Sequence, residues 1–102
     1  MKLVHILMAA TVVVSAPAFA SKELAQKNAC LACHAADKKL VGPAYQEVAK
    51  KYAGQKDAVD ALAKSIKAGG SGKWGAIPMP AQAALSEADA KTLATWILAG
   101  AK

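Results

Sequence analysis

The sequence contains no arginine: all 13 of its basic residues are lysines, and with seven acidic residues the formal net charge is +6. Aromatic residues are also few, with two tryptophans, two tyrosines and one phenylalanine. Proteins that read nucleic acids use bidentate arginine for bases and stacked aromatic rings for single strands. We therefore expect no nucleic-acid ligand. Dispersed lysines suit a reversible encounter with an acidic protein surface, and they equally serve solubility.

Long apolar runs are scarce, and the one that is present lies at the N-terminus. A basic residue is followed by a mostly apolar stretch, residues 3–14, then by Pro17 and the small-residue signal Ala18-Phe19-Ala20. This order predicts a secretory signal peptide, residues 1–20, rather than a membrane anchor, which needs roughly 20 apolar residues. Residues 21–102 are then one small soluble domain, exported to the periplasm and without a membrane span.

No stretch alternates apolar and polar residues as a strand does, so we predict an all-α fold. Apolar spacing, capping residues and glycines indicate four short helices. These run from Ser21 into the cysteines, from Pro43 to Gly54, from Asp57 to Gly69 and from Ser86 to Gly100. The connection 69–85 is long for so small a domain, and such loops are usually functional or disordered. Alanine dominates the apolar positions, and so thin an interior needs a disulfide, a metal or a cofactor.

The segment Cys30-Leu31-Ala32-Cys33-His34 could be half of a zinc site, a redox dithiol or a haem anchor. A structural zinc needs four ligands, and the one other histidine, His5, belongs to the predicted signal peptide. A dithiol active site normally accompanies a βαβ pattern, which is absent. Haem fits, because residues at i, i+3 and i+4 share one face of a helical turn. Cys-x-x-Cys-His is also the c-type attachment signature.

The chain resembles the small bacterial monohaem class I cytochromes c of the c-551 type over nearly all of residues 21–102. Besides the cysteine motif, three segments match that family in the same order. They are Val41-Gly42-Pro43-Ala44-Tyr45, Tyr52-Ala53-Gly54 and Trp74-Gly75-Ala76-Ile77-Pro78-Met79-Pro80. The resemblance implies a class I cytochrome c fold, about four short helices wrapped round one covalently bound haem c.

The resemblance also implies roles for six residues. Cys30 and Cys33 hold the haem through thioethers, and His34 and Met79 are the proximal and distal ligands of its iron. The Pro43 carbonyl accepts a hydrogen bond from His34, and Trp74 bonds a haem propionate. The residues themselves also favour Met79, since it is the one methionine of residues 21–102 and lies between two prolines. These prolines stiffen the segment that carries it.

Three positions depart from the pattern of the family. Ala29 stands where relatives often have glycine. Ser65 stands where some relatives have a basic residue that contacts a propionate. Gln82 lies near the position at which some relatives have an asparagine that bonds the methionine sulfur.

The predicted function is one-electron transfer in the periplasm between respiratory redox partners, in which the haem iron cycles between ferrous and ferric. Because both axial positions are filled, we do not expect an enzyme. The alternative is a haem enzyme or sensor with an open distal site, which applies if Met79 does not ligate. The expected partners are redox proteins with acidic docking surfaces, such as a reductase, an oxidase or a peroxidase. We expect the carrier to be a monomer.

Overall fold

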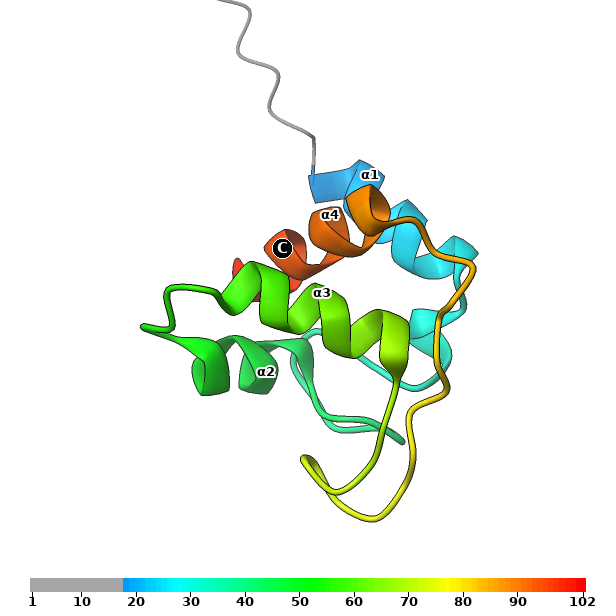
Figure 1. Cartoon of the computed structure of the whole chain (residues 1–102), viewed down its shortest axis with the longest axis vertical. Helices are drawn as coiled ribbons and strands as arrows, with labels where there is room; N and C mark the ends of the chain where they lie inside the picture. Colours follow the sequence, from blue (N-terminus) through cyan, green and yellow to red (C-terminus); the bar gives the residue numbers. More distant parts are fainter. Residues whose placement is uncertain (1–17) are drawn as a thin grey trace, which may run out of the picture.

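The computed structural model describes residues 18–102, with side chains from residue 21 onward, and consists of four α-helices joined by loops (Figure 1). The helices are α1 (Ala18–Lys27), α2 (Tyr45–Tyr52), α3 (Ala58–Ala68) and α4 (Glu87–Leu98), and a 3₁₀ turn, η1 (Cys30–Ala32), follows α1. These residues contain no β-strand, only two isolated backbone bridges. The predicted all-α fold is confirmed for this part of the chain. The predicted signal peptide falls outside the described residues except where α1 begins, and it stays a prediction.

Helix α1 differs from the prediction at both ends. Ser21 does not cap it, because the helix already begins at Ala18. Ser21 is instead a buried residue of this helix. At its other end α1 stops at Lys27 instead of running into the cysteines. Ala29 has a left-handed backbone with φ 59°, which a right-handed helix does not contain. No glycine marks this stop in the sequence, so the apolar spacing alone led to the wrong boundary.

Helices α2 and α3 lie close to their predicted bounds. Gly54 and Gly69, which follow them, have φ values of 81° and 65°, and both helices therefore end where glycine permits a left-handed turn. Asp57 directly precedes α3, but its side chain makes no capping hydrogen bond. The buried residues are Tyr45, Val48 and Tyr52 on α2, and Leu62, Ala63 and Ile66 on α3.

Helix α4 begins with the predicted cap. The Ser86 hydroxyl accepts a hydrogen bond from the Asp89 backbone N–H at 3.0 Å, which satisfies one of the four N–H groups that lack a partner in the first turn. Trp96, near the end of this helix, is buried at 7% exposure. Its ring meets Tyr45 edge-on, with 5.4 Å between centroids.

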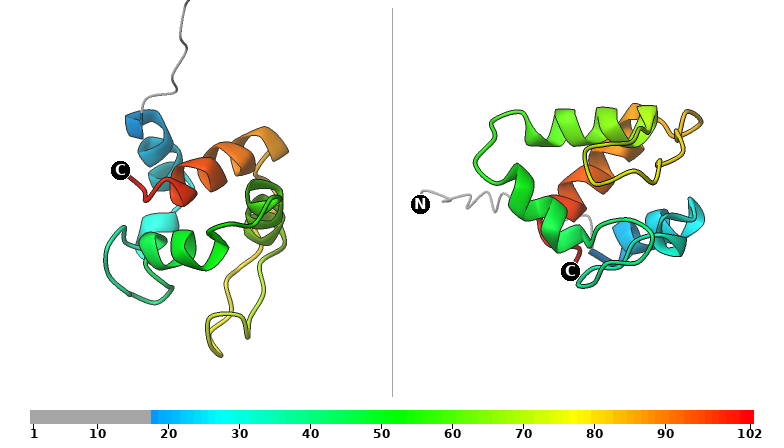
Figure 2. Two further views of the ribbon diagram at one scale, coloured as in Figure 1. Left: turned by 90° about the vertical axis from the view of Figure 1, so that its left-hand side faces the viewer. Right: turned by 90° about the horizontal axis from the view of Figure 1, so that it is seen from below.

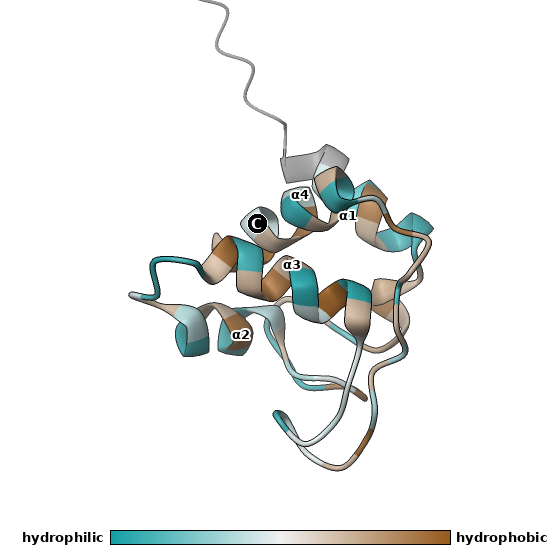
Figure 3. Ribbon diagram, viewed as in Figure 1, coloured by the Kyte–Doolittle hydropathy of each residue, from teal (hydrophilic) through white to brown (hydrophobic). Residues whose placement is uncertain are grey.

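Helix α4 is the central element of the packing, because it contacts α1, α2 and α3. Figure 2 shows it crossing α1, and Figure 3 shows hydrophobic and hydrophilic segments alternating along α3. Five of the buried apolar residues are alanines, namely Ala25, Ala44, Ala63, Ala90 and Ala94. The thin interior that the sequence predicts is therefore observed. None of the described helices is long and apolar enough to cross a membrane.

Candidate cofactor site

A cavity of about 340 Å³ opens between η1, α2, α3 and the long loop 69–85. All six residues to which the sequence assigned a site role line it: Cys30, Cys33, His34, Pro43, Trp74 and Met79. They come from two parts of the chain that are far apart in the sequence, residues 30–43 and residues 74–79. In Figure 1 the loop that follows η1 and the loop 69–85 both extend below α3. The fold thus gathers the whole candidate set around one space.

The two cysteines lie on a single helical turn although α1 does not reach them. The backbone N–H groups of Cys33 and His34 both donate to the Cys30 carbonyl, at 3.2 and 3.0 Å. The turn therefore keeps the i, i+3, i+4 arrangement that the motif requires. Both cysteines are half-buried free thiols, and burial raises the pKa of the Cys30 thiol.

The His34 ring is held by the chain segment that follows it. Its Nδ1 lies 2.8 Å from the Pro43 carbonyl oxygen, so the expected hydrogen bond is present. A carbonyl oxygen only accepts, so Nδ1 carries the proton and Nε2 keeps its lone pair for a metal. The Tyr45 ring stacks on the imidazole, with 5.1 Å between centroids and 17° between planes. These contacts restrict the imidazole before any ligand binds.

Gly42 allows this arrangement, and sequence reasoning did not assign it a role. A methyl carbon at Gly42 would lie 2.4 Å from Cε1 and 2.8 Å from Nδ1 of His34. Backbone and ring therefore meet where no side chain fits. The Gly42 N–H also donates to the Cys33 carbonyl at 2.7 Å. The sequence signal was its position directly before Pro43.

Met79 is held by the backbone of the loop that carries it. Its N–H donates to the Gly70 carbonyl at 2.8 Å, and the Gly70 N–H donates to its carbonyl at 3.0 Å. A methyl carbon at Gly69 would lie 2.5 Å from the Met79 oxygen and 2.7 Å from the Ala81 nitrogen. Gly69 was read as a helix stop, and it also allows this close backbone contact. Met79 is partly buried against the hydrophobic core.

Trp74 lies at the edge of the cavity and is 39% exposed. The Lys51 ammonium lies 4.4 Å from the centroid of its ring, a distance typical of cation–π contacts. Ser65 also lines the cavity. The Gln82 backbone N–H donates to the Ile66 carbonyl at 3.3 Å.

The residues of the cavity fit a haem better than a zinc ion. Among residues 18–102, no group of three or more histidine, cysteine, aspartate and glutamate side chains is arranged to hold a metal. The cavity lining instead combines one imidazole, one thioether and two thiols with mostly apolar side chains. An imidazole and a thioether are one of the known axial pairs of haem iron, and the thiols can add to its vinyl groups.

The comparisons with known proteins agree with this fit. The sequence profile of the family described as Cytochrome c matches residues 20–101. The chain is 55% identical over 92 residues to cytochrome c-552 of Hydrogenobacter thermophilus, covering 90% of this chain and 93% of the relative. It is 58% identical over 77 residues to cytochrome c-551 of Azotobacter vinelandii, covering 76% and 93%. The crystal structure of wild-type Nitrosomonas europaea cytochrome c552 superposes with a TM-score of 0.75 at 53% identity, covering 78% of this chain and 98% of that one.

Proposed function

Because the chain belongs to the cytochrome c family, as a small class I member with one covalently bound haem c, we propose that it is a periplasmic one-electron carrier between respiratory redox partners. When bound, the haem supplies the one-electron chemistry through an iron that alternates between ferrous and ferric. The protein then binds, orients and insulates this group. It makes no bond in a substrate, so it acts as a carrier and not as an enzyme.

The observation that supports the proposal most directly is that Cys30, Cys33, His34 and Met79 line one cavity. The two thiols form the thioether links to the haem vinyl groups. His34 is the proximal ligand through Nε2, because the Pro43 carbonyl, 2.8 Å from Nδ1, holds the proton on the other nitrogen. This hydrogen bond also fixes the plane of the imidazole.

Met79 is the distal ligand in this proposal. Pro78 and Pro80 restrict the backbone on either side of it, and the paired hydrogen bonds to Gly70 hold the segment in place. A weak thioether ligand binds at lower entropic cost when its chain is already ordered. Thioether ligation favours ferrous iron and raises the reduction potential. The alternative, a haem enzyme or sensor with an open distal site, requires Met79 to stay off the iron.

The remaining assignments concern location and partners. Residues 1–20 are the cleaved signal peptide, residues 21–102 are a single domain, and the product is a monomer in the periplasm. Trp74, at the edge of the cavity, bonds a haem propionate. The net charge of +6, which becomes +5 when Lys2 is removed with the signal peptide, suits partners with acidic docking surfaces.

The test is to express the full chain with export and haem attachment, and to purify it from the periplasm. The intact mass should equal residues 21–102 plus one haem, and the ferric form should show the far-red sulfur–iron charge-transfer band. In Met79→Ala this band should disappear, the reduction potential should fall, and cyanide should bind quickly. If Met79→Ala kept the wild-type band and potential, the distal ligand and the closed, six-coordinate carrier would both be wrong.

A further inference from the structure

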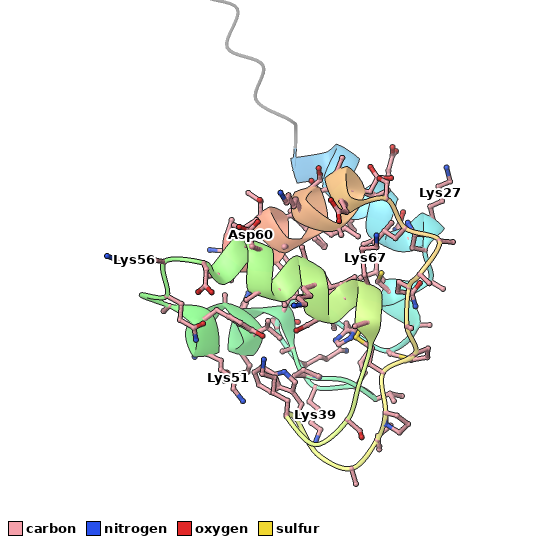
Figure 4. The ribbon with its side chains drawn as sticks, in the orientation of Figure 1. Lys27, Lys39, Lys51, Lys56, Asp60 and Lys67 are labelled. Carbon is pink, nitrogen blue, oxygen red and sulfur yellow. The ribbon has the colours of Figure 1, made fainter. Side chains whose placement is uncertain are left out.

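Two lysines and two aromatic rings gather at the edge of the cavity. The Lys73 ammonium donates to the Tyr52 hydroxyl at 2.7 Å and lies 5.0 Å from the centroid of that ring. The Lys51 ammonium donates to the Lys73 carbonyl at 3.2 Å and lies over the Trp74 ring. Figure 4 labels Lys51 below α2, next to the loop 69–85. Contacts from both directions thus tie the end of α2 to this loop.

The cluster contains positive charge without a matching acid. The ion pairs of the described residues join Lys50 to Glu47 and Lys91 to Asp60, and all four side chains are largely exposed. Among the described residues neither Lys51 nor Lys73 pairs with a carboxylate, and no aspartate or glutamate lines the cavity. Two like charges held around one pair of rings repel each other. An anion beside them would remove this cost.

Lys73 is well placed to meet such an anion. It lines the cavity together with Tyr52 and Trp74, and an ammonium has three donors. It can therefore keep its hydrogen bond to the Tyr52 hydroxyl and still donate to a carboxylate. Ser65, which also lines the cavity, offers only a neutral hydroxyl and cannot supply the positive charge.

We propose that Lys73 is the cation that binds a carboxylate of the haem, one of its two propionates, with Lys51 as a second positive charge at the rim. This inference rests on the proposed haem site. A propionate carries negative charge that favours the ferric state, and the Lys73 ammonium offsets that charge. Lys73 thereby raises the reduction potential and keeps the propionate ionised, because an opposite charge nearby favours the charged form.

The test measures the reduction potential of the haem-loaded protein from about pH 5 to about pH 8. The variants are Lys73→Gln and the charge-conserving Lys73→Arg. Lys56→Gln is the control, because Lys56 is exposed in the α2–α3 connection and lies at the far edge of the molecule in Figure 4. Besides Cys30, Cys33 and His34, the titratable groups that line the cavity are Lys39, Tyr45, Tyr52 and Lys73, and Lys51 lies at its rim.

The reduction potential of Lys73→Gln should be lower than that of the wild type, and the decrease should be larger than the one that Lys56→Gln causes. Lys73→Arg should have the wild-type potential. The potential of Lys73→Gln should also rise as the pH falls, because a propionate that has lost its cation takes up a proton within the range. The intact mass and the far-red band of the wild type are recorded first, and their absence contradicts the proposed function. With both present, a potential equal to the control, or one shifted equally at every pH, overturns the role of Lys73.

Discussion

Replacing Gly42 by alanine should disturb the His34 ring as well as lower the stability of the protein. The added methyl carbon would lie 2.4 Å from Cε1, 2.8 Å from Nδ1 and 2.9 Å from Nε2 of the imidazole. Real contacts of this kind are well above 3 Å, so the ring or the backbone has to move. The φ of Gly42 is not in the left-handed region. The effect is therefore steric and falls on the proposed ligand.

Its magnitude follows from two contributions. Forcing an extra carbon into a packed site costs about 1–3 kcal/mol, and losing the 2.8 Å hydrogen bond between His34 and the Pro43 carbonyl costs about 1 kcal/mol more. A loss of about 2–4 kcal/mol lowers the melting temperature of a domain this small by at least about 8 °C. The assay is thermal unfolding of the haem-loaded protein, together with the far-red band and the reduction potential.

Gly54→Ala is the matched control. Nothing lies within 4 Å of a methyl carbon at Gly54, but its φ is 81°, so alanine there costs about 1–2 kcal/mol of backbone strain. This variant should lose stability and keep the wild-type spectrum and potential. Gly42→Ala should change all three. If Gly42→Ala melted and absorbed like the wild type, the close contact between Gly42 and His34 would not hold the ring.

Two further predictions concern α1 and the docking surface. Ala29→Gly should stabilise the protein by about 1 kcal/mol, because glycine has no steric penalty at φ 59°. The control Ala32→Gly, one turn later and without a left-handed φ, should not stabilise it. Equal melting temperatures for Ala29→Gly and the wild type would contradict this prediction. The rate of electron transfer to a native partner should fall steeply as the salt concentration rises, since the Debye length shrinks from about 10 Å at 0.1 M to about 3 Å at 1 M. A rate independent of the salt concentration would mean that the lysines serve solubility and not docking.

The sequence predicted most of the fold because its local signals agree with one another. Gly54, Gly69 and the Ser86 cap lie at the ends of helices that also have a regular apolar face, and these helices formed as expected. The end of α1 was missed because Ala29 takes a left-handed conformation that alanine rarely adopts. Nothing in the local sequence distinguishes such an alanine from one inside a helix.

Some residues of the site could be predicted from the sequence and others could not. The motif and the resemblance named six residues that line one cavity, because attachment chemistry fixes residue types at short spacing. Gly42, Gly69 and Lys73 were not assigned to the site. Their contacts join residues that are distant in the sequence or depend on the course of a loop. The position of a glycine in the sequence does not show which side chain or backbone atoms lie against it in the fold.

Backbone contacts help to hold the two proposed axial ligands. The His34 ring lies between the Gly42 backbone, the Pro43 carbonyl and the Tyr45 ring, and Met79 is paired through both its N–H and its carbonyl. A core rich in alanine could not fix two ligands by side-chain packing alone. Backbone hydrogen bonds add to this packing and restrict both residues. A site built in this way suits electron transfer, because both ligands can stay in place in both oxidation states.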